Sequence, residues 1–348
     1  MEIRELDPSD DAEMRAWYDV YLASESEGRE YHQAYAFEEV RGAFRTPTPM
    51  TRLRPQLASL DGEVVGVAGL ALPQLDNTAT AEVAVGVRPD RWGEGIGTAL
   101  LRRVEEVACG EGRTLLLGEA GYPYDGPADG AGTRAVEFAR SRGFELGLGD
   151  VQRVLDLPVP EALLDELAAR AAERHEGYTF RQFAGAAPED VFAELCALRA
   201  AVDVEAPMGE IAREAGVVDV PALRANEEAL AEQGRTRYTT VALGPDGTVA
   251  GYTDLVVPEF DPPWIYQWGT LVWSGHRGHR LGLALKARNA AWVQRRFPDR
   301  RAIRTWNAEV NAHMVAVNEA WASVPWSGWG SSRSGWAERG VHQSGAAV

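Results

Sequence analysis

Hydrophobic and polar positions along the chain alternate between strand-like and helix-like periods, and the same order of elements occurs twice. In the first round, strands are predicted at 2–6, 53–60, 63–72, 79–87, 113–118 and 151–157, and helices at 7–23, 96–109 and 135–142. In the second round, strands are predicted at 178–183, 238–243, 251–258, 265–272 and 302–305, and helices at 188–200, 222–233, 281–297 and 310–320. This repetition indicates an internal duplication.

The length of 348 residues is more than one core usually fills, which favours two domains. Pro158, Pro160 and an Ala/Glu-rich helix at 161–176 separate the two rounds. We therefore predict an N-terminal domain at 1–158, a connector at 159–176 and a C-terminal domain at 177–348. The mixture of strands and helices predicts an α/β (α+β) fold.

The composition restricts the classes of partner and the cellular location that we expect for the protein. A formal charge of −17 disfavours nucleic acid, which needs a basic surface, and is compatible with a cationic amine, although a generally acidic surface is the simpler interpretation. No apolar run approaches the ~20 residues of a membrane span, and the N-terminus is acidic, unlike a signal peptide. The two cysteines, Cys109 and Cys196, exclude a disulfide framework. We expect a cytoplasmic protein without membrane or nucleic-acid partners.

A glycine-rich turn between a strand and a helix carries the strongest chemical signal. Gly93, Gly95 and Gly97 follow the strand that ends at Val87 and precede an amphipathic helix. Glycines allow a tight turn whose backbone N–H groups converge at a helix N-terminus, where an anion is favoured. The pattern predicts a pyrophosphate site. The spacing is not that of a dinucleotide fingerprint, and no lysine completes a P-loop.

This segment resembles the acetyl-CoA-binding motif of the GNAT (N-acetyltransferase) family, and Gly143-Phe144 resembles the ending of the family's fourth helix. The resemblance implies a mixed, mostly antiparallel sheet that splits after the motif strand, with pantetheine in the split and pyrophosphate on the turn. The residues that it assigns to acetyl-CoA in the first half are Val85, Gly86, Val87, Trp92, Gly93, Glu94, Gly95, Ile96, Gly97 and Thr98.

The second half repeats the pattern when Val272 is aligned with Val87, and the layout is similar to that of tandem members of the family such as mycothiol synthase. The residues assigned to acetyl-CoA there are Thr270, Leu271, Val272, Arg277, Gly278, His279, Arg280, Leu281, Gly282 and Asn311. Arg280 replaces the middle glycine, so it either obstructs the site or supplies a guanidinium to a phosphate. His276 and His279 have the spacing of a metal pair, but no third ligand completes a set, and no metal is expected.

The first domain also departs from the family, which usually has Arg or Gln at the position of Trp92. In the family a glutamate on the strand before the motif often acts as base, and Glu82 occupies such a position. The alternative is an exposed strand carboxylate without a catalytic role. The aligned residue in the second half, Gln267, cannot act as a base.

The family's fourth helix often holds a tyrosine that protonates the leaving thiol. The matching positions here are Ala139 and Asn318, so that acid is missing from both halves. Tyr122 or Tyr124, in a predicted loop at 119–132, is the candidate replacement. We favour the first domain as the catalytic one.

The resemblance implies an acetyltransferase that moves an acetyl group from acetyl-CoA to the amine of a small molecule or peptide, as a monomer or homodimer. The alternative is a non-catalytic acetyl-CoA-binding or regulatory protein, which the missing acid, Trp92 and Arg280 favour.

The tail after about residue 320 is atypical, because four of the eleven tryptophans lie there. A reading frame shifted by one base permits the Leu-Gly-Phe ending that the resemblance implies after 318–320. We therefore expect a frameshifted tail, irregular after about residue 325.

Overall fold

The computed structural model describes residues 1–29, 32, 34–124, 126–205, 211, 213–308 and 332–340. The chain folds into two compact units. The first comprises Met1–Asp150, Gly209–Ala212 and Gly330–Val348, and the second comprises Val151–Met208 and Arg213–Trp329. The first unit therefore includes residues from the end of the chain.

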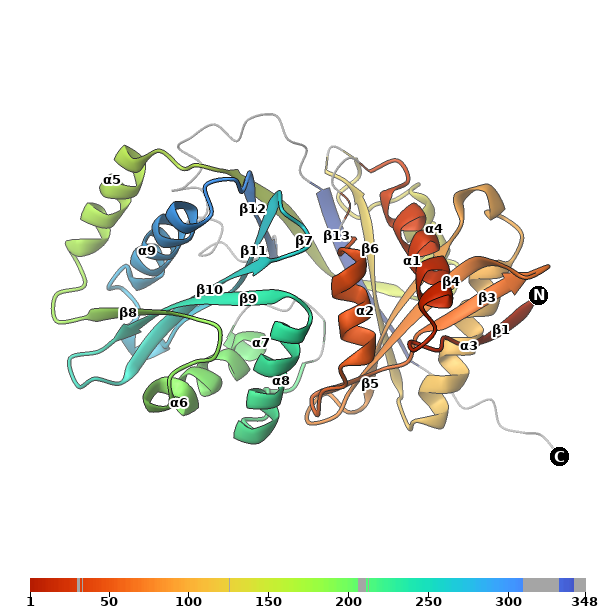
Figure 1. Cartoon of the computed structure of the whole chain (residues 1–348), viewed down its shortest axis with the longest axis horizontal. Coiled ribbons are helices and arrows are strands. Elements are labelled where there is room, and N and C mark those ends of the chain that lie inside the picture. Colours follow the sequence, from red (N-terminus) through yellow and green to blue (C-terminus); the bar gives the residue numbers. More distant parts are fainter. Residues whose placement is uncertain are drawn as a thin grey trace. The chain divides into compact units, whose positions relative to one another are not determined.

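The first unit is a mixed sheet with helices on both faces (Figure 1). Its elements are β1 (Glu2–Glu5), α1 (Asp11–Ser26), α2 (Phe37–Arg45), β2 (Thr51–Leu53), β3 (Gln56–Leu60), β4 (Glu63–Pro73), β5 (Thr80–Val87), η1 (Pro89–Arg91), α3 (Ile96–Gly110), β6 (Leu115–Pro123), α4 (Arg134–Arg140) and β13 (Ser332–Gly340). The strand order is β1-β3-β4-β5-β6-β13, with β2 beside β4. Only the β5–β6 pair is parallel within this order.

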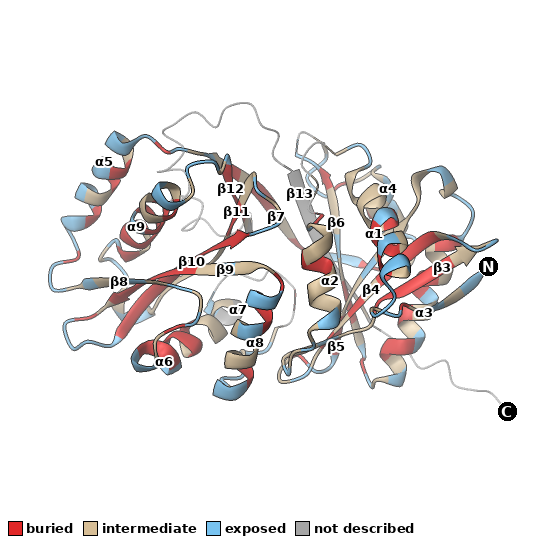
Figure 2. Ribbon diagram, viewed as in Figure 1, coloured by how far each residue is buried: buried red, intermediate tan, exposed pale blue. Residues whose placement is uncertain are grey.

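Two apolar clusters hold the helices of the first unit to the sheet. Met14 and Trp17 of α1 pack with Leu57 and Val67 on one face, which we call the α1 face. On the opposite, α3 face, the apolar stripe of α3 packs against β4, β5 and β6. The stripe comprises Ile96, Leu100, Leu101, Val104, Val107 and Ala108. Figure 2 shows these buried positions as red bands on the sheet and the inner sides of the helices. The periodicity of α3 is thus explained by burial.

β6 is longer than predicted, because β13 pairs with its whole length. The antiparallel register runs from Leu115 opposite Gly340 to Pro123 opposite Ser332. The prediction of a loop at 119–132 is therefore wrong for its first five residues, 119–123, which are strand. The expectation that residues after about 325 are irregular is also wrong for 332–340. Residues 323–330 lie outside the described residues, so the frameshift hypothesis remains a prediction.

The second unit repeats this architecture. Its elements are β7 (Glu145–Asp156), which begins in the first unit, α5 (Glu161–Ala172), β8 (Thr179–Ala184), α6 (Glu189–Ala200), α7 (Val202–Glu205), α8 (Val220–Glu232), β9 (Arg235–Leu243), β10 (Val249–Pro258), β11 (Trp264–Val272), η2 (Ser274–His276), α9 (Leu281–Arg296) and β12 (Ala302–Ala308). The strand order is β12-β11-β10-β9-β8, and β11–β12 is parallel. The predicted α/β fold with two mixed, mostly antiparallel sheets is confirmed.

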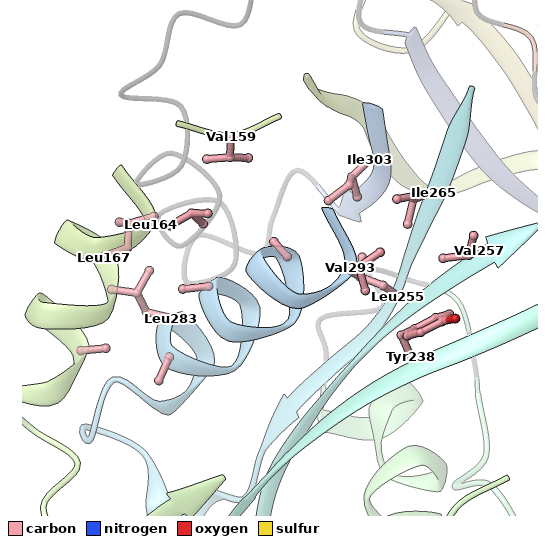
Figure 3. Packing of buried hydrophobic residues seen from close by; sticks show 14 residues of the cluster. Val159, Leu164, Leu167, Tyr238, Leu255, Val257, Ile265, Leu283, Val293 and Ile303 are labelled. Atoms are coloured by element: carbon pink, nitrogen blue, oxygen red, sulfur yellow. The ribbon is translucent and has the colours of Figure 1, made fainter. Parts of the chain in front are cut away.

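Helices cover both faces of the second sheet. Leu164 and Leu167 of α5 and Leu283 and Val293 of α9 pack together over the strands, as Figure 3 shows. On the other face, α6 packs its apolar side against β9 and β10. Within the described ranges, no helix is long and apolar enough to cross a lipid bilayer.

The two units share a register that supports the duplication. Gly66 lies opposite Val87 in the first unit, and Gly251 lies opposite Val272 in the second. A Cβ on Gly66 would lie 2.7 Å from Ile96 and 2.8 Å from Leu100. On Gly251, it would lie 3.0 Å from the Leu271 carbonyl oxygen. Both glycines therefore occupy corresponding places where the sheet is tightly packed.

Lys286 is a charged residue on the buried side of α9, at the position that aligns with the apolar Leu101 of α3. Burial, and then the Arg153 charge, lower the pKa of Lys286 to about 8, against about 10.4 in an unfolded chain. Between about pH 8 and about 10.4 the unfolded state binds more protons than the folded state. The free energy of unfolding should therefore rise with pH across this range, by about 3 kcal/mol in total.

We therefore expect Lys286→Met to stabilise the protein at pH 7 and to remove most of this pH dependence. Denaturant unfolding of both proteins near pH 7.5 and pH 9.5 checks this. Parallel pH profiles would contradict it.

Candidate active site

The parallel strands β5 and β6 separate partway along their length. They pair from Thr80 opposite Leu115 to Val83 opposite Gly118, and no pair follows. β5 continues to Val87 against β4, while β6 continues to Pro123 against β13. The split that the resemblance implied is therefore present in the first unit, beyond Val83 and Gly118.

Backbone groups of Val85 and Val87 face this split. The Arg88 N–H donates to the Val65 carbonyl on β4 at 3.0 Å, and backbone groups alternate in direction along a strand. The groups of Val85 and Val87 consequently point away from β4. The Trp92 indole Nε1–H donates to the Val87 carbonyl at 2.9 Å, so that carbonyl already has a partner.

The turn between β5 and α3 is open at the glycines. Gly93 and Gly95 have φ of +88° and +83°, which L side chains rarely adopt, and a Cβ on either would meet no atom within 4 Å. Gly93, Glu94 and Gly95 are exposed, and Gly95 is the N-cap of α3. Ile96, the first residue of α3, is instead buried between the helix and the sheet. An exposed turn that leads into a 15-residue helix can bind an anion through its N–H groups.

Gly97 serves packing, since a Cβ there would lie 3.2 Å from the Phe138 ring of α4. This close approach brings the residues around α4 to the first turn of α3. Arg142 donates through Nη2 to Thr98 Oγ1, and the Arg134 guanidinium lies 4.2 Å from the centroid of the Trp92 ring. No motif in the sequence assigns a ligand-binding role to either arginine.

Glu82 lies on the α1 face, one residue before the strands separate. Val83, Val85 and Val87 pack on the α3 face, and successive residues alternate. Gly86 lies four residues after Glu82 and therefore on the same face of β5. A Cβ on Gly86 would lie 3.0 Å from Ser24 Oγ of α1. Glu82 is partly buried, and its place in the pairing puts it beside the point where a ligand in the split would enter the sheet.

Tyr122 lies on the opposite face. Its ring is 3% exposed, and a Cβ on Gly130 would lie 2.8 Å from it. Its hydroxyl donates to the Ala128 carbonyl at 2.9 Å, which anchors the segment before α4. This placement argues against Tyr122 as the acid for a reaction beside Glu82. Tyr124, just beyond β6, is 44% exposed.

In the second unit the split begins at a different place, and the strand is bulged. Pairing of β11 with β12 ends at Tyr266 opposite Arg304. Thr270 pairs with Thr253, but Gln267 pairs with Leu255, so β11 carries an extra residue between them. Leu255 packs in the cluster beneath α9, and its partner Gln267 therefore faces α9 as well.

Gln267 thus points to the face opposite the one where Glu82 lies in the first unit. Its Nε2 donates to the Asp254 carbonyl at 2.8 Å and satisfies the backbone at the bulge. Beyond the bulge, Leu271 packs with the α6 cluster, and Val272 packs against Leu281 and Leu285 of α9.

Two side chains of the turn in the second unit bond the end of α5. Arg280 is the N-cap of α9 with φ of +52°, a strained conformation for a side-chain-bearing residue. Its Nη1 donates to the Arg170 carbonyl at 2.6 Å and to Glu173 at 2.7 Å. His279 bonds the Arg174 carbonyl at 2.8 Å. In this structure the Arg280 side chain is held by the end of α5, and the two alternatives for it, phosphate ligand or obstruction, stay predictions.

The other polar residues of this turn also have partners. Arg277 pairs with Glu205 at 2.5 Å, and His276 Nδ1 lies 2.9 Å from the Tyr178 hydroxyl. Gly278 and Gly282 are unobstructed, and Leu281 is buried. Asn311 lies outside the described residues. Among those described, no three His, Cys, Asp or Glu side chains form a group that could hold a metal ion.

Residues 14–119, which include β5, the glycine turn and α3, match the sequence model of the acetyltransferase (GNAT) family. A tandem GNAT protein from the clavulanic acid biosynthesis pathway, solved without AcCoA, is similar over 99% of both chains, with 28% identity and a TM-score of 0.80. The chain thus has a GNAT acetyltransferase domain in its first unit and a tandem GNAT layout overall. The resemblance to the GNAT acetyltransferase family is confirmed over residues 14–119, and the general chemistry of that family is acyl transfer.

More distant structures share the fold. A GCN5-related N-acetyltransferase from Sphaerobacter thermophilus is 17% identical, with 98% of this chain and 96% of that chain covered and a TM-score of 0.62. A putative acetyltransferase from Pyrococcus horikoshii is 13% identical, with 98% and 89% covered and a TM-score of 0.55. Among curated proteins, no sequence matches the chain.

Proposed function

We propose that the first unit transfers an acetyl group from acetyl-CoA to an amine. The observation that carries this proposal is one arrangement: β5 and β6 separate just after Glu82, and β5 leads into the exposed turn at Gly93 and Gly95. One ligand can therefore place phosphates on the turn and extend its chain into the split, with its reactive end beside a carboxylate.

We assign each part of this site a role in the proposed reaction. The N–H groups at 92–98 bind the diphosphate, and backbone groups of Val85 bind the pantetheine amide. The amine nitrogen attacks the thioester carbonyl from the α1 face, and Glu82 accepts the amine proton directly or through water. The C–S bond breaks, and CoA leaves as the thiolate. No side chain is assigned as its acid.

The second unit lacks this combination. Its Gln267 cannot accept a proton and faces α9, and Arg280 and His279 bond the end of α5 instead of facing a ligand. Carbonyl oxygens at the end of α5 also bring negative partial charge to the turn. These contacts support assignment of acetyl-CoA to the first unit.

We expect one molecule of CoA to bind per chain, and Gly278→Glu in the second unit to change its affinity by less than about twofold. Gly278 has φ of +86° and an unobstructed Cβ position, so the substitution matches one at Gly95 in geometry. Titration calorimetry of both proteins gives the stoichiometry and the affinity. Two sites per chain, or loss of binding in Gly278→Glu, would move the ligand to the second unit.

A further inference from the structure

Two arginines meet the first turn of α3 from the segment around α4. The Arg134 guanidinium lies 4.2 Å from the centroid of the Trp92 ring. The Arg142 guanidinium lies 3.9 Å from the centroid of the Phe138 ring and donates to Thr98 in the first turn of α3. Aromatic rings therefore support both cations beside the proposed diphosphate site.

Trp92 is fixed in the orientation that this contact requires. Its indole N–H donates to the Val87 carbonyl at 2.9 Å, which ties the ring to the end of β5. Family members that resemble this chain usually have Arg or Gln at this position. The Trp92 side chain is uncharged and its one N–H already bonds Val87, but its ring holds Arg134 at the same turn.

The charges at this turn are not balanced by the described protein. The N-terminus of a helix carries partial positive charge, so nearby cations are unfavourable without an anion. Among the described residues, neither Arg134 nor Arg142 forms an ion pair with a carboxylate, whereas Arg140 of the same α4 pairs with Asp129 at 2.7 Å. The Nε of Arg142 is buried and makes no hydrogen bond to a described residue.

We propose that Arg134 binds phosphate groups of the CoA nucleotide and supplies the cationic contact that Trp92 cannot, and that Arg142 positions Thr98 beside them. This inference rests on the proposed function, because it requires CoA at the β5–α3 turn. Arg134 is exposed and reaches the phosphates directly. Arg142 contributes charge and positions Thr98, whose backbone lies within the turn. Guanidinium–phosphate hydrogen bonds are charge-assisted and geometrically specific.

The test is calorimetric titration of CoA and of dephospho-CoA, which lacks the 3′-phosphate, into the wild-type protein, Arg134→Gln and Arg140→Gln. We expect Arg134→Gln to weaken CoA binding by about 10-fold. Arg140→Gln, which removes an arginine from the same helix, should weaken it by less than about twofold. An equal loss for both ligands assigns Arg134 to the diphosphate, and a loss for CoA alone assigns it to the 3′-phosphate.

A rescue experiment separates phosphate binding from damage to the fold. Trp92→Arg returns the side chain usual in the family, and in the Arg134→Gln background it should recover part of the lost affinity. Equal affinities of Arg134→Gln and Arg140→Gln would overturn the inference. A wild-type protein that binds no CoA would instead overturn the proposed function, so the two failures are distinct.

Discussion

Replacing Gly95 with glutamate should weaken CoA binding by at least about 100-fold, or about 2.7 kcal/mol. Gly95 is the exposed N-cap of α3, and its backbone has φ of +83°. The new side chain would extend from the turn where the N–H groups converge, and its negative charge would repel phosphate. The same backbone conformation costs a non-glycine residue about 1–2 kcal/mol, so some stability should be lost as well.

Gly112→Glu separates these two effects. Gly112 follows the opposite end of α3, has φ of +76° and has no atom within 4 Å of its Cβ position. It should lose similar stability but keep its affinity for CoA. Calorimetry and thermal unfolding of both variants provide the comparison. Full affinity in Gly95→Glu would remove the glycine turn from the site.

Glu82→Gln should lower turnover by roughly 10²–10⁴-fold and leave CoA affinity nearly unchanged. The amide keeps the shape and polarity of the side chain but cannot accept the amine proton. Glu82 is beside the last pairs of β5 with β6, whereas the proposed CoA contacts begin at Val85. Steady-state kinetics together with calorimetry distinguish a base from a binding residue.

Glu63→Gln is the matched control, since Glu63 begins the neighbouring strand β4 and pairs on the surface with Arg88 at 3.3 Å. Its turnover should equal that of the wild type. If Glu82→Gln retained the wild-type rate, the base would have to be sought elsewhere.

The glycine turn was predictable because its cause is local, whereas the split was expected only from the family resemblance. Gly93 and Gly95 have positive φ, which the sequence signals through the residue type itself. The apolar period of α3 follows from its burial on one face. These features support the positions proposed for phosphate and pantetheine in the first unit.

Features that depend on distant segments were not predictable. The Gly, Pro, Tyr and Asp residues at 119–132 predict a loop around Tyr122, but β13, more than 200 residues later, pairs with residues 119–123. Gln267 was aligned with Glu82 by counting residues, and one bulge residue turned it to the other face. Arg134 and Arg142 reach the turn only through the packing of Phe138 on Gly97, which no spacing in the sequence indicates.

Amine-dependent release of the CoA thiol from acetyl-CoA tests the central claim most directly. The assay uses a panel of small-molecule and peptide amines with the wild-type protein, Gly95→Glu and Gly278→Glu, and mass spectrometry identifies the acetylated amine. We expect release by the wild type and by Gly278→Glu, and none by Gly95→Glu. Release that persists in Gly95→Glu would place the reaction outside the first unit's turn. CoA binding without turnover of any amine would contradict the enzymatic function and support a binding or regulatory role.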